Sequence, residues 1–252
     1  MIVTPDMDAS KGKEAADGPS YHESPAPPAY YPQSQSGGQA ILPQAPFKSK
    51  PTNFLELTKD NGHLRGEYVI DPSLIIAPSY LPPLTPGETD GDRKNLHLYT
   101  KNGHVRADIW LIGANAPLAM GRNRATLNLG SHNGPIVAKL QQYNAAVPFL
   151  LNIHAKNGHT TVFVPRSFNG LLLLSPEHGK IAFSDGIKAN SRLLGQYDGK
   201  GKYFVGLIPG EGANTWCGDE VRIESANGHI RIRYIDEEDD GIKSVIGKLI
   251  GL

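Results

Sequence analysis

A tight turn between two alternating runs of apolar and polar residues recurs along this chain and limits what it can fold into. On one side of Asn102-Gly103, Leu96, Leu98 and Thr100 alternate with more polar residues, and on the other side Val105, Ala107 and Ile109 do the same. This period of two is typical of strands with one buried face. Asn and Gly both accept the positive φ angles of a two-residue turn. The same parity holds around Asn133-Gly134, Asn157-Gly158, Asn227-Gly228 and the related His178-Gly179, and more weakly around Asn61-Gly62.

Two all-β architectures remain open from this pattern. If the turn residues form the whole loop, Leu98 faces Ala107 and Leu96 faces Ile109, whereas a slip of one residue would turn the apolar face outward. The parity is the same for an antiparallel β-sandwich made of hairpins and for an adhesin-like β-solenoid whose strands bend at a corner. Successive turns lie 41, 31, 24, 21 and 49 residues apart. This irregularity favours hairpins with unequal loops over a regular solenoid.

The repeats also resemble known families. Lys101-Asn102-Gly103-His104-Val105 and Ala226-Asn227-Gly228-His229-Ile230 resemble the repeat of adhesin-like β-solenoid families. A fuller arrangement over roughly residues 50–236 resembles an uncharacterised fungal family of domains of unknown function, and its marks are Ile70-Asp71-Pro72, Leu81-Pro82-Pro83, the block Leu96–Ile112 and Gly218-Asp219-Glu220-Val221. The resemblance implies a repetitive β architecture. It carries over no catalytic residue and no cofactor, because that family has no established activity.

Composition excludes several classes of protein. Lys plus Arg equals Asp plus Glu at 25 each, and a balanced charge argues against a nucleic-acid partner, which needs a basic surface. Cys217 is the single cysteine, so no disulfide forms within the chain. The sequence has no signal-peptide pattern at its start, no glycosylation sequon and no apolar run long enough for a transmembrane segment. We therefore expect a cytoplasmic protein.

The chain divides into three parts. Residues 1–50 are rich in Pro, Ser, Gly and Gln, cannot bury a core, and are predicted to be a disordered arm. Residues 51–236 form the repetitive β domain, in which the Pro- and Gly-broken loop 72–95 is predicted to pack across a face as an edge cover. Residues 237–252 combine an acidic run with a short helix.

The arm contains one recognition motif. Pro27, Pro28 and Tyr30 form a Pro-Pro-x-Tyr match. WW domains bind such segments because the polyproline II conformation is preformed and Tyr docks in an aromatic groove. The alternative is a chance match in a Pro-rich linker.

The C-terminal helix is amphipathic. Within residues 241–252, the apolar residues fall on one face at Ile242, Val245, Ile246, Leu249 and Ile250. Twelve residues are too few for a stable isolated helix, so the helix needs a surface. We expect it to dock on the β core, and the alternatives are peripheral membrane contact and a partner protein.

No catalytic or metal site stands out. His63, His104, His159 and His229 follow the Asn-Gly turns and could align if the repeats stack, but closely spaced ligands for a metal are missing. Ser131, within Gly130–Gly134, only superficially resembles a nucleophile elbow. The acidic residues Asp185, Asp198, Glu211 and Asp219 are scattered, so a glycosidase would need two of them to converge. Cys217, beside Trp216, is predicted to pack as a small hydrophobic residue.

We therefore predict a non-enzymatic binding or scaffold protein with a rigid β surface that recruits a WW-domain partner through its arm. The alternative is a carbohydrate-active enzyme or a glycan-binding adhesin on a β-solenoid. A catalytic groove with two converging carboxylates would favour the enzyme.

Overall fold

The computed structural model describes residues 45–84, 86–113, 117–144, 146–208 and 216–237, all within a compact unit that begins at Ala45. The segments outside these ranges include the Pro-Pro-x-Tyr match and the predicted C-terminal helix. Both predictions therefore concern residues outside the described part of the chain.

Fourteen strands make up most of the described chain. Their bounds are β1 Leu55–Asn61, β2 Leu64–Ile70, β3 Leu96–Asn102, β4 Val105–Ile112, β5 Ala125–Asn133, β6 Ile136–Tyr143, β7 Phe149–Asn157, β8 Thr160–Val164, β9 Gly170–His178, β10 Ile181–Phe183, β11 Ser191–Tyr197, β12 Lys200–Val205, β13 Asp219–Asn227 and β14 Ile230–Tyr234. One short helix, α1, spans Asp185–Asn190, and single 3-10 turns span Pro78–Tyr80, Asp90–Asp92, Ala119–Gly121 and Ile235–Glu237.

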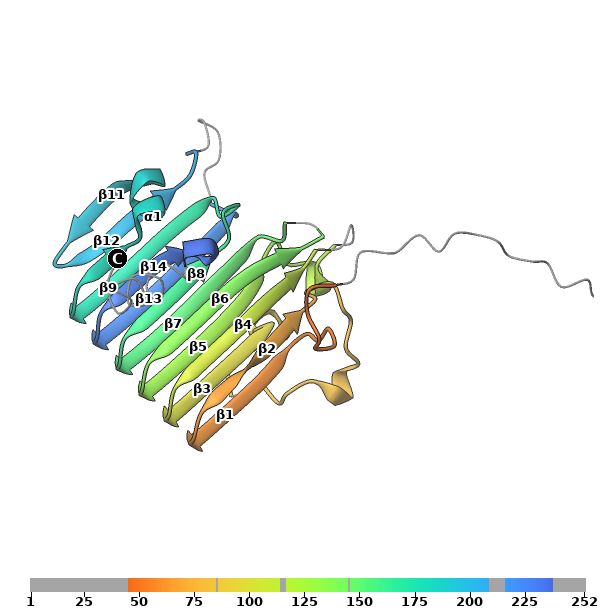
Figure 1. The fold of residues 1–252 in the computed structure, drawn as a ribbon. Coiled ribbons are helices and arrows are strands. Elements are labelled where there is room, and N and C mark those ends of the chain that lie inside the picture. Colours follow the sequence, from red (N-terminus) through yellow and green to blue (C-terminus); the bar gives the residue numbers. More distant parts are fainter. Residues whose placement is uncertain (1–44, 85, 114–116, 145, 209–215, 238–252) are drawn as a thin grey trace, which may run out of the picture. The chain divides into compact units, whose positions relative to one another are not determined.

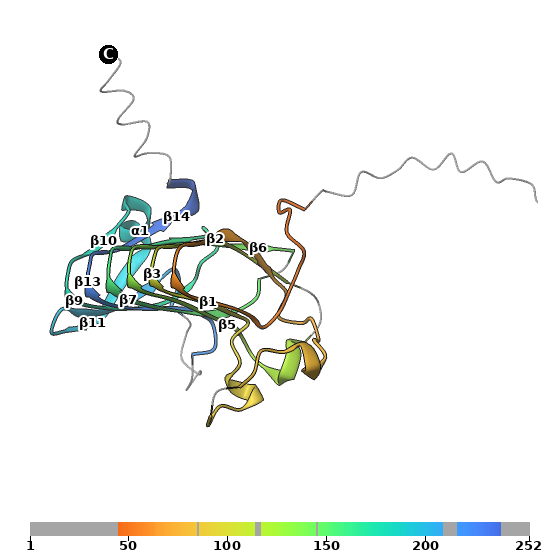
Figure 2. The same ribbon diagram turned by 90° about the horizontal axis from the view of Figure 1, so that it is seen from below.

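The strands form two layers. One sheet has eight strands in the order β1-β3-β5-β7-β13-β9-β12-β11, and the other has six in the order β10-β14-β8-β6-β4-β2. Each Asn-Gly or His-Gly turn carries the chain from the first sheet to the second, so two strands and their turn form one rung of a stack (Figures 1 and 2). Neighbouring rungs pair in parallel and in register, as Leu98 with Leu129 and Ala107 with Ala138 illustrate.

The prediction of an all-β repetitive fold is confirmed, and the structure decides between the two alternatives. The repeats are rungs of a two-sheet β-solenoid, and the interpretation of the Asn-Gly units as antiparallel hairpins is wrong. Leu98 and Ala107 lie in opposite sheets, so they face each other across the core instead of across one ladder. A true two-residue hairpin does occur at Asp198-Gly199, between β11 and β12.

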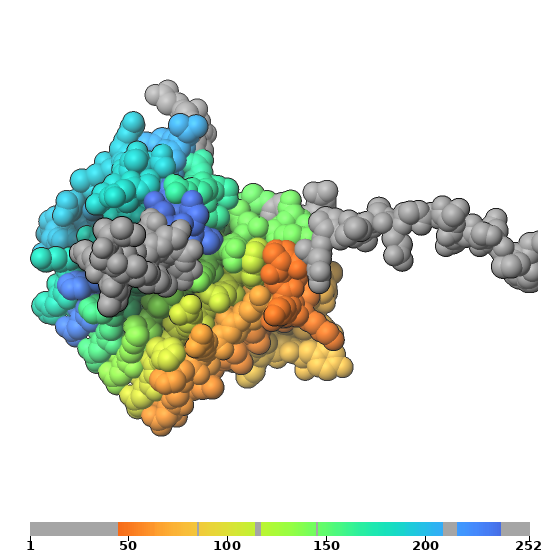
Figure 3. Space-filling model, in the orientation of Figure 1, coloured from red at the N-terminus to blue at the C-terminus, as the bar shows by residue number. Residues whose placement is uncertain are grey.

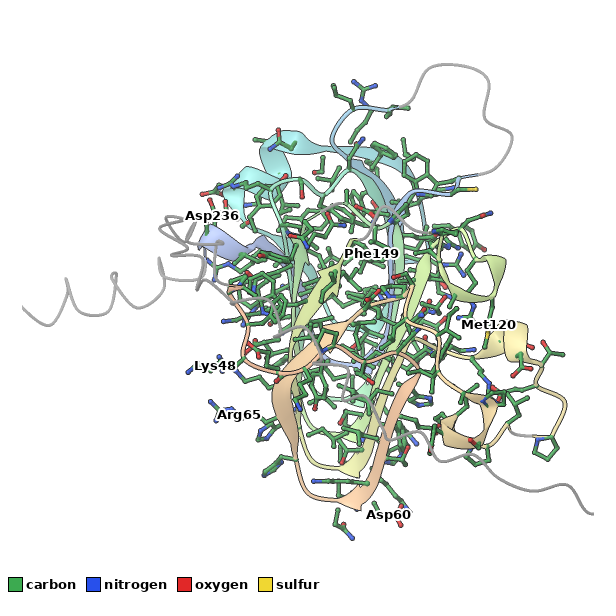
Figure 4. The ribbon with its side chains drawn as sticks, turned by 90° about the vertical axis from the view of Figure 1, so that its right-hand side faces the viewer. Lys48, Asp60, Arg65, Met120, Phe149 and Asp236 are labelled. Atoms are coloured by element: carbon green, nitrogen blue, oxygen red, sulfur yellow. The ribbon has the colours of Figure 1, made fainter. Side chains whose placement is uncertain are left out.

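The core lies between the sheets. Inward residues of the interior strands, such as β3, β4 and β7, are almost fully buried, whereas most of the residues between them are partly exposed. Phe149 is the largest fully buried side chain, and it lies between the two layers in Figure 4, where Asp60 marks the turn edge of the first rung. At this first end of the stack, Tyr68 lies over Gly66 and is itself buried, so its ring closes the core.

The rungs do not follow chain order. The last repeat, β13–β14, lies between the β7–β8 rung and the β9–β10 rung, where its residues appear in blue between green and teal (Figure 1). The same band of blue interrupts the order of colours along the turn edge in the space-filling view (Figure 3). This insertion accounts for the longest interval between turns, from His178 to Asn227, because the chain first forms the β11–β12 hairpin and then returns.

The Pro- and Gly-broken loop 72–95 lies on the outer side of the eight-stranded sheet (Figure 2). Pro82 and Pro83 border a small cavity together with Glu56 of β1 and His97 of β3, as expected for a loop that packs across a face. On the opposite sheet, Phe47 contacts the rings of Trp110 and Tyr143, so the last residues of the predicted arm run along the β domain.

Candidate binding groove on the eight-stranded sheet

The turn edge is held together by a ladder of asparagines. Asn102 donates its side-chain amide to Asn61 at 2.9 Å, and Asn133, Asn157 and Asn227 repeat this bond along the stack at 2.8, 2.8 and 3.0 Å. The turn Asn is therefore required by the neighbouring rung as well as by the turn itself. A side-chain ladder of this kind fixes the register, because any slip would break every bond at once.

The glycines of the turns stack without room for a side chain. A Cβ atom on Gly103, Gly134, Gly158, Gly228 or Gly179 would lie 2.0–2.4 Å from the carbonyl oxygen of the glycine in the adjacent rung. These contacts are to backbone atoms that a rotamer change cannot move. Gly62 of the first rung meets no atom within 4 Å, since no further rung lies beyond it.

The turn histidines also stack. The rings of His63 and His104 are 3.8 Å apart, and those of His159 and His229 are 5.0 Å apart. The backbone N–H of His104 donates to Nδ1 of His63, and that of His229 donates to Nδ1 of His159. Each of these rings therefore accepts a hydrogen bond at Nδ1 from the backbone of the adjacent rung. Among the residues that the structure describes, no group of three His, Cys, Asp or Glu side chains is placed to hold a metal ion.

A groove lies on the outer face of the eight-stranded sheet, close to the turn edge. Its floor follows the residues three positions before each turn, which the register places side by side in the spatial order Tyr99, Gly130, His154, Glu224 and Ser175. Gly130 supplies no side chain, and the ring of Tyr99 lies against it, since an added Cβ would come 2.7 Å from that ring. The resulting hollow encloses about 430 Å³ and is walled on its far side by Lys200 of the β11–β12 hairpin.

The groove is polar and electrically balanced. His154 Nδ1 lies 3.1 Å from a carboxylate oxygen of Glu224, across the boundary between β7 and the inserted β13. Lys156 and Lys200 contribute two positive charges against those of Glu224 and Glu177. His132 also lines this groove, and its Nδ1 atom is buried without a hydrogen-bond partner among the described residues. Because that atom is buried, it is not exposed to a ligand in the groove.

The geometry does not assemble a hydrolase relay. A Ser-His-acid relay requires the histidine to lie between the serine and the acid. Here Ser175, Glu224 and His154 lie on adjacent strands in that order, so the carboxylate occupies the middle position. Ser131, the serine of the elbow-like segment, is buried and donates to the carbonyl oxygen of Gly103 at 3.0 Å. Its role is to join two rungs.

Two acids at the start of β13 have perturbed protonation. Burial raises the pKa of Asp219 to about 6, although the N–H groups of Phe149 and Asn169 oppose that shift. Burial also acts to raise the pKa of Glu220, but Arg222 and Arg124 outweigh it and hold that pKa below its usual value. Both acids are anchors of the inserted rung: Asp219 accepts from Phe149 of β7, and Glu220 pairs with Arg124 at 2.8 Å.

The residues singled out from the sequence have different outcomes. Pro27, Pro28 and Tyr30 lie outside the described residues. Asp185 begins α1 and Asp198 lies in the hairpin turn, so neither reaches the groove. Cys217 is exposed, and the prediction that it packs as a small hydrophobic residue is wrong.

Sequence reasoning missed the groove acids Glu177 and Glu224. The signal was present in the alignment of the repeats on their turns, where Tyr99, Gly130, His154 and Glu224 all stand three residues before the turn Asn.

A family model for a domain of unknown function, DUF7330, matches residues 53–237, so the chain belongs to that family. The match spans all fourteen strands. No curated protein and no solved structure matches the chain. Within the described part of the chain, no helix is long and apolar enough to cross a membrane.

Proposed function

We propose that this chain is a non-enzymatic binding protein whose rigid β-solenoid presents the groove of the eight-stranded sheet to a glycan. The observation that carries the proposal is the groove itself, a polar hollow built on strands that are paired on both sides. Strands fixed in this way hold binding groups more precisely than loops do.

The chemistry of the groove supports a neutral polyhydroxyl ligand. Two carboxylates and two ammonium groups offer acceptors and donors for hydroxyl groups, while their charges cancel. Tyr99 adds an aromatic ring beside the floor at Gly130, of the kind that packs against the C–H face of a sugar. The groove crosses strands about 4.8 Å apart, so its side chains repeat at that spacing along its floor.

The test is a glycan screen with the full-length protein, followed by titration calorimetry on the ligands found. Glu224→Ala and Tyr99→Ala should each weaken binding at least about tenfold, equivalent to roughly 1.4 kcal/mol. Thr161→Ala, which changes an outward residue of β8 on the opposite sheet, is the matched control and should leave binding unchanged. Equal affinity of all three variants, or no glycan bound by the wild type, would contradict the proposal.

A carbohydrate-active enzyme is the second candidate, and the presence of Glu177 and Glu224 in one groove favours it. The two acids lie on the neighbouring strands β9 and β13. Glu224 pairs with Ser175, and Glu177 lies two positions further along β9. Glycosidases need two carboxylates about 5–10 Å apart. Release of reducing ends from a bound glycan, abolished by Glu177→Gln and by Glu224→Gln, would establish the enzyme and overturn the binding-only proposal.

The arm adds a recruitment site to this proposal. Pro27, Pro28 and Tyr30 would bind a WW-domain protein while the β domain holds the glycan. Tyr30→Ala should abolish binding to WW domains in a fluorescence-anisotropy titration, and unchanged binding would remove this motif from consideration.

A further inference from the structure

Most turns of the stack contain a chemically reactive dipeptide. When the backbone N–H of a glycine loses its proton, its nitrogen can attack the side-chain amide carbon of a preceding asparagine. A C–N bond forms, ammonia leaves and a cyclic succinimide results, which water opens to aspartate or isoaspartate. Five of the six turns between rungs are Asn-Gly pairs, and their asparagines are Asn61, Asn102, Asn133, Asn157 and Asn227.

The stack occupies the attacking N–H group in each of these five turns. Gly62 donates its backbone N–H to the carbonyl oxygen of Asn102 in the next rung, at 2.9 Å. The same bond recurs along the stack at 2.9, 2.7, 3.0 and 3.3 Å, from Gly103, Gly134, Gly158 and Gly228. An N–H group held in this way must leave its acceptor before the nitrogen can react. The succinimide can therefore form only when a rung opens.

All these bonds point in the same direction, which leaves one turn glycine without an acceptor. The last rung in space is β9–β10, where the carbonyl oxygen of His178 accepts from Gly228. Strand β10 is the edge of its sheet, and the N–H of Gly179 has no hydrogen-bond acceptor among the described residues. This turn is also the one in which the glycine does not follow an asparagine. The imidazole of His178 offers no amide to displace, so the unprotected turn is unreactive.

The first rung is the least enclosed of the five Asn-Gly turns. Asn61 accepts the side-chain amide of Asn102, but its own amide nitrogen donates no hydrogen bond among the described residues. A Cβ atom on Gly62 would meet nothing within 4 Å, and β1 is exposed along almost its whole length. An end rung has a neighbour on one side only, so it opens at a lower free energy than an inner rung does.

We propose that Asn61 is a site of spontaneous deamidation in the folded protein, and that stacking protects the other four Asn-Gly turns. The two products differ in their effect. An aspartate keeps a side-chain oxygen for the bond from Asn102, so the rung can remain in place. An isoaspartate adds a methylene group to the main chain inside a two-residue turn, so β1 and β2 lose their register with the stack. Strand β3 then becomes the edge of its sheet.

The experiment is peptide mapping by mass spectrometry on the full-length protein after incubation at neutral pH. Trypsin separates the five turns, because a Lys or Arg lies between each and the next. Asn61 should convert to aspartate and isoaspartate at least about tenfold faster than any of the other four. In urea all five should react at similar rates, because no rung is then formed.

The last rung provides a sharper test. His178 is exposed, so His178→Asn should fold normally while placing a reactive residue before Gly179. The new asparagine should deamidate faster than Asn61, because no hydrogen bond has to open first. His178→Gln is the matched control: it adds the same amide, but its longer side chain would have to close a larger and slower-forming ring. It should keep the thermal midpoint of the wild type and remain unmodified.

Three results would overturn the proposal. The first is a folded wild type in which Asn61 reacts no faster than the four inner turns, and the second is a preference for Asn61 that persists in urea. The third is a folded His178→Asn protein whose new asparagine reacts as slowly as the inner turns, since the hydrogen bond of the glycine would then not control the reaction. None of these outcomes depends on glycan binding, so this inference stands or falls separately from the proposed function.

Discussion

Replacing Gly228 by Ala should unfold the stack from its middle, and the structure allows the cost to be worked out. The new Cβ atom would lie 2.0 Å from the carbonyl oxygen of Gly158 and 2.6 Å from its carbon, both in the backbone of the adjacent rung. No rotamer can relieve this overlap. The two rungs must therefore separate locally by about 1 Å or more to reach an ordinary contact distance.

That separation would break the hydrogen bonds that cross the same gap. Four of them lie at the turn: Asn227 to Asn157 between side chains at 3.0 Å, Gly158 N–H to the Asn227 carbonyl at 3.0 Å, Thr160 N–H to the His229 carbonyl at 2.9 Å, and His229 N–H to His159 Nδ1 at 3.1 Å. At about 0.5–1.5 kcal/mol each, their loss amounts to roughly 2–6 kcal/mol. A domain of this size is stable by only about 5–15 kcal/mol, so the variant should lose a large share of its stability.

Urea unfolding followed by circular dichroism measures this loss. Gly91→Ala is the matched control, because its Cβ would meet only the Thr89 hydroxyl at 3.4 Å, in a loop far from the turn edge. A free energy of unfolding for Gly228→Ala within about 1 kcal/mol of the control would refute the argument that the glycines are required by stacking.

Three further predictions follow from single residues. Lys59→Thr replaces an inward charge on the edge strand β1 by the residue type found at Thr100 in the next rung. The substitution should unblock this edge, so light scattering should detect larger particles than those of the wild type. Asp219→Asn should stabilise the protein above pH 6 by at most about 3 kcal/mol. Burial raises the pKa of Asp219 in the folded state to about 6, so ionisation of this carboxyl lowers the free energy of unfolding as pH rises from about 4 to 6. Unfolding curves of variant and wild type that differ equally at pH 3.5 and pH 7 would contradict this prediction. Burial and, to a smaller extent, the proximity of His63 lower the pKa of His104 in the folded state. As pH falls through about 6.5, the unfolded chain takes up the proton first, so the stability of the folded state should fall. His104→Gln should reduce this change in a plot of thermal midpoint against pH.

The sequence predicted which side chains are buried but not which strands are neighbours. Leu98 and Ala107 face each other whether the chain makes a hairpin or bends between two sheets, because the parity about a two-residue turn is the same in both. What separates the cases is the stacking of Gly103 on Gly62, a contact between backbones 41 residues apart. Alternation within one repeat contains no information about it.

The place of the last rung was equally out of reach. Val221 and Ile223 of β13 pair with Leu151 and Ile153 on one side and with Leu172 and Leu174 on the other. Inward positions of all three strands carry aliphatic residues of similar size, so the β7 and β9 patterns would also fit each other directly. The specific signals are polar and local, namely Asp219 accepting from Phe149 and Glu220 pairing with Arg124. Such contacts can be recognised only once the strands are placed.

The inserted rung connects this topology to the groove. If the rungs followed chain order, His154 of β7 would stand beside Ser175 of β9, and the hollow would contain one acid, Glu177. Insertion of β13 puts Glu224 between them, 3.1 Å from His154, and moves β9 one strand spacing of about 4.8 Å further along the sheet. The balance of two acids and two lysines in the groove therefore depends on the last repeat being in place. Any perturbation that loosens β13–β14, Gly228→Ala included, should weaken ligand binding before it unfolds the first rungs.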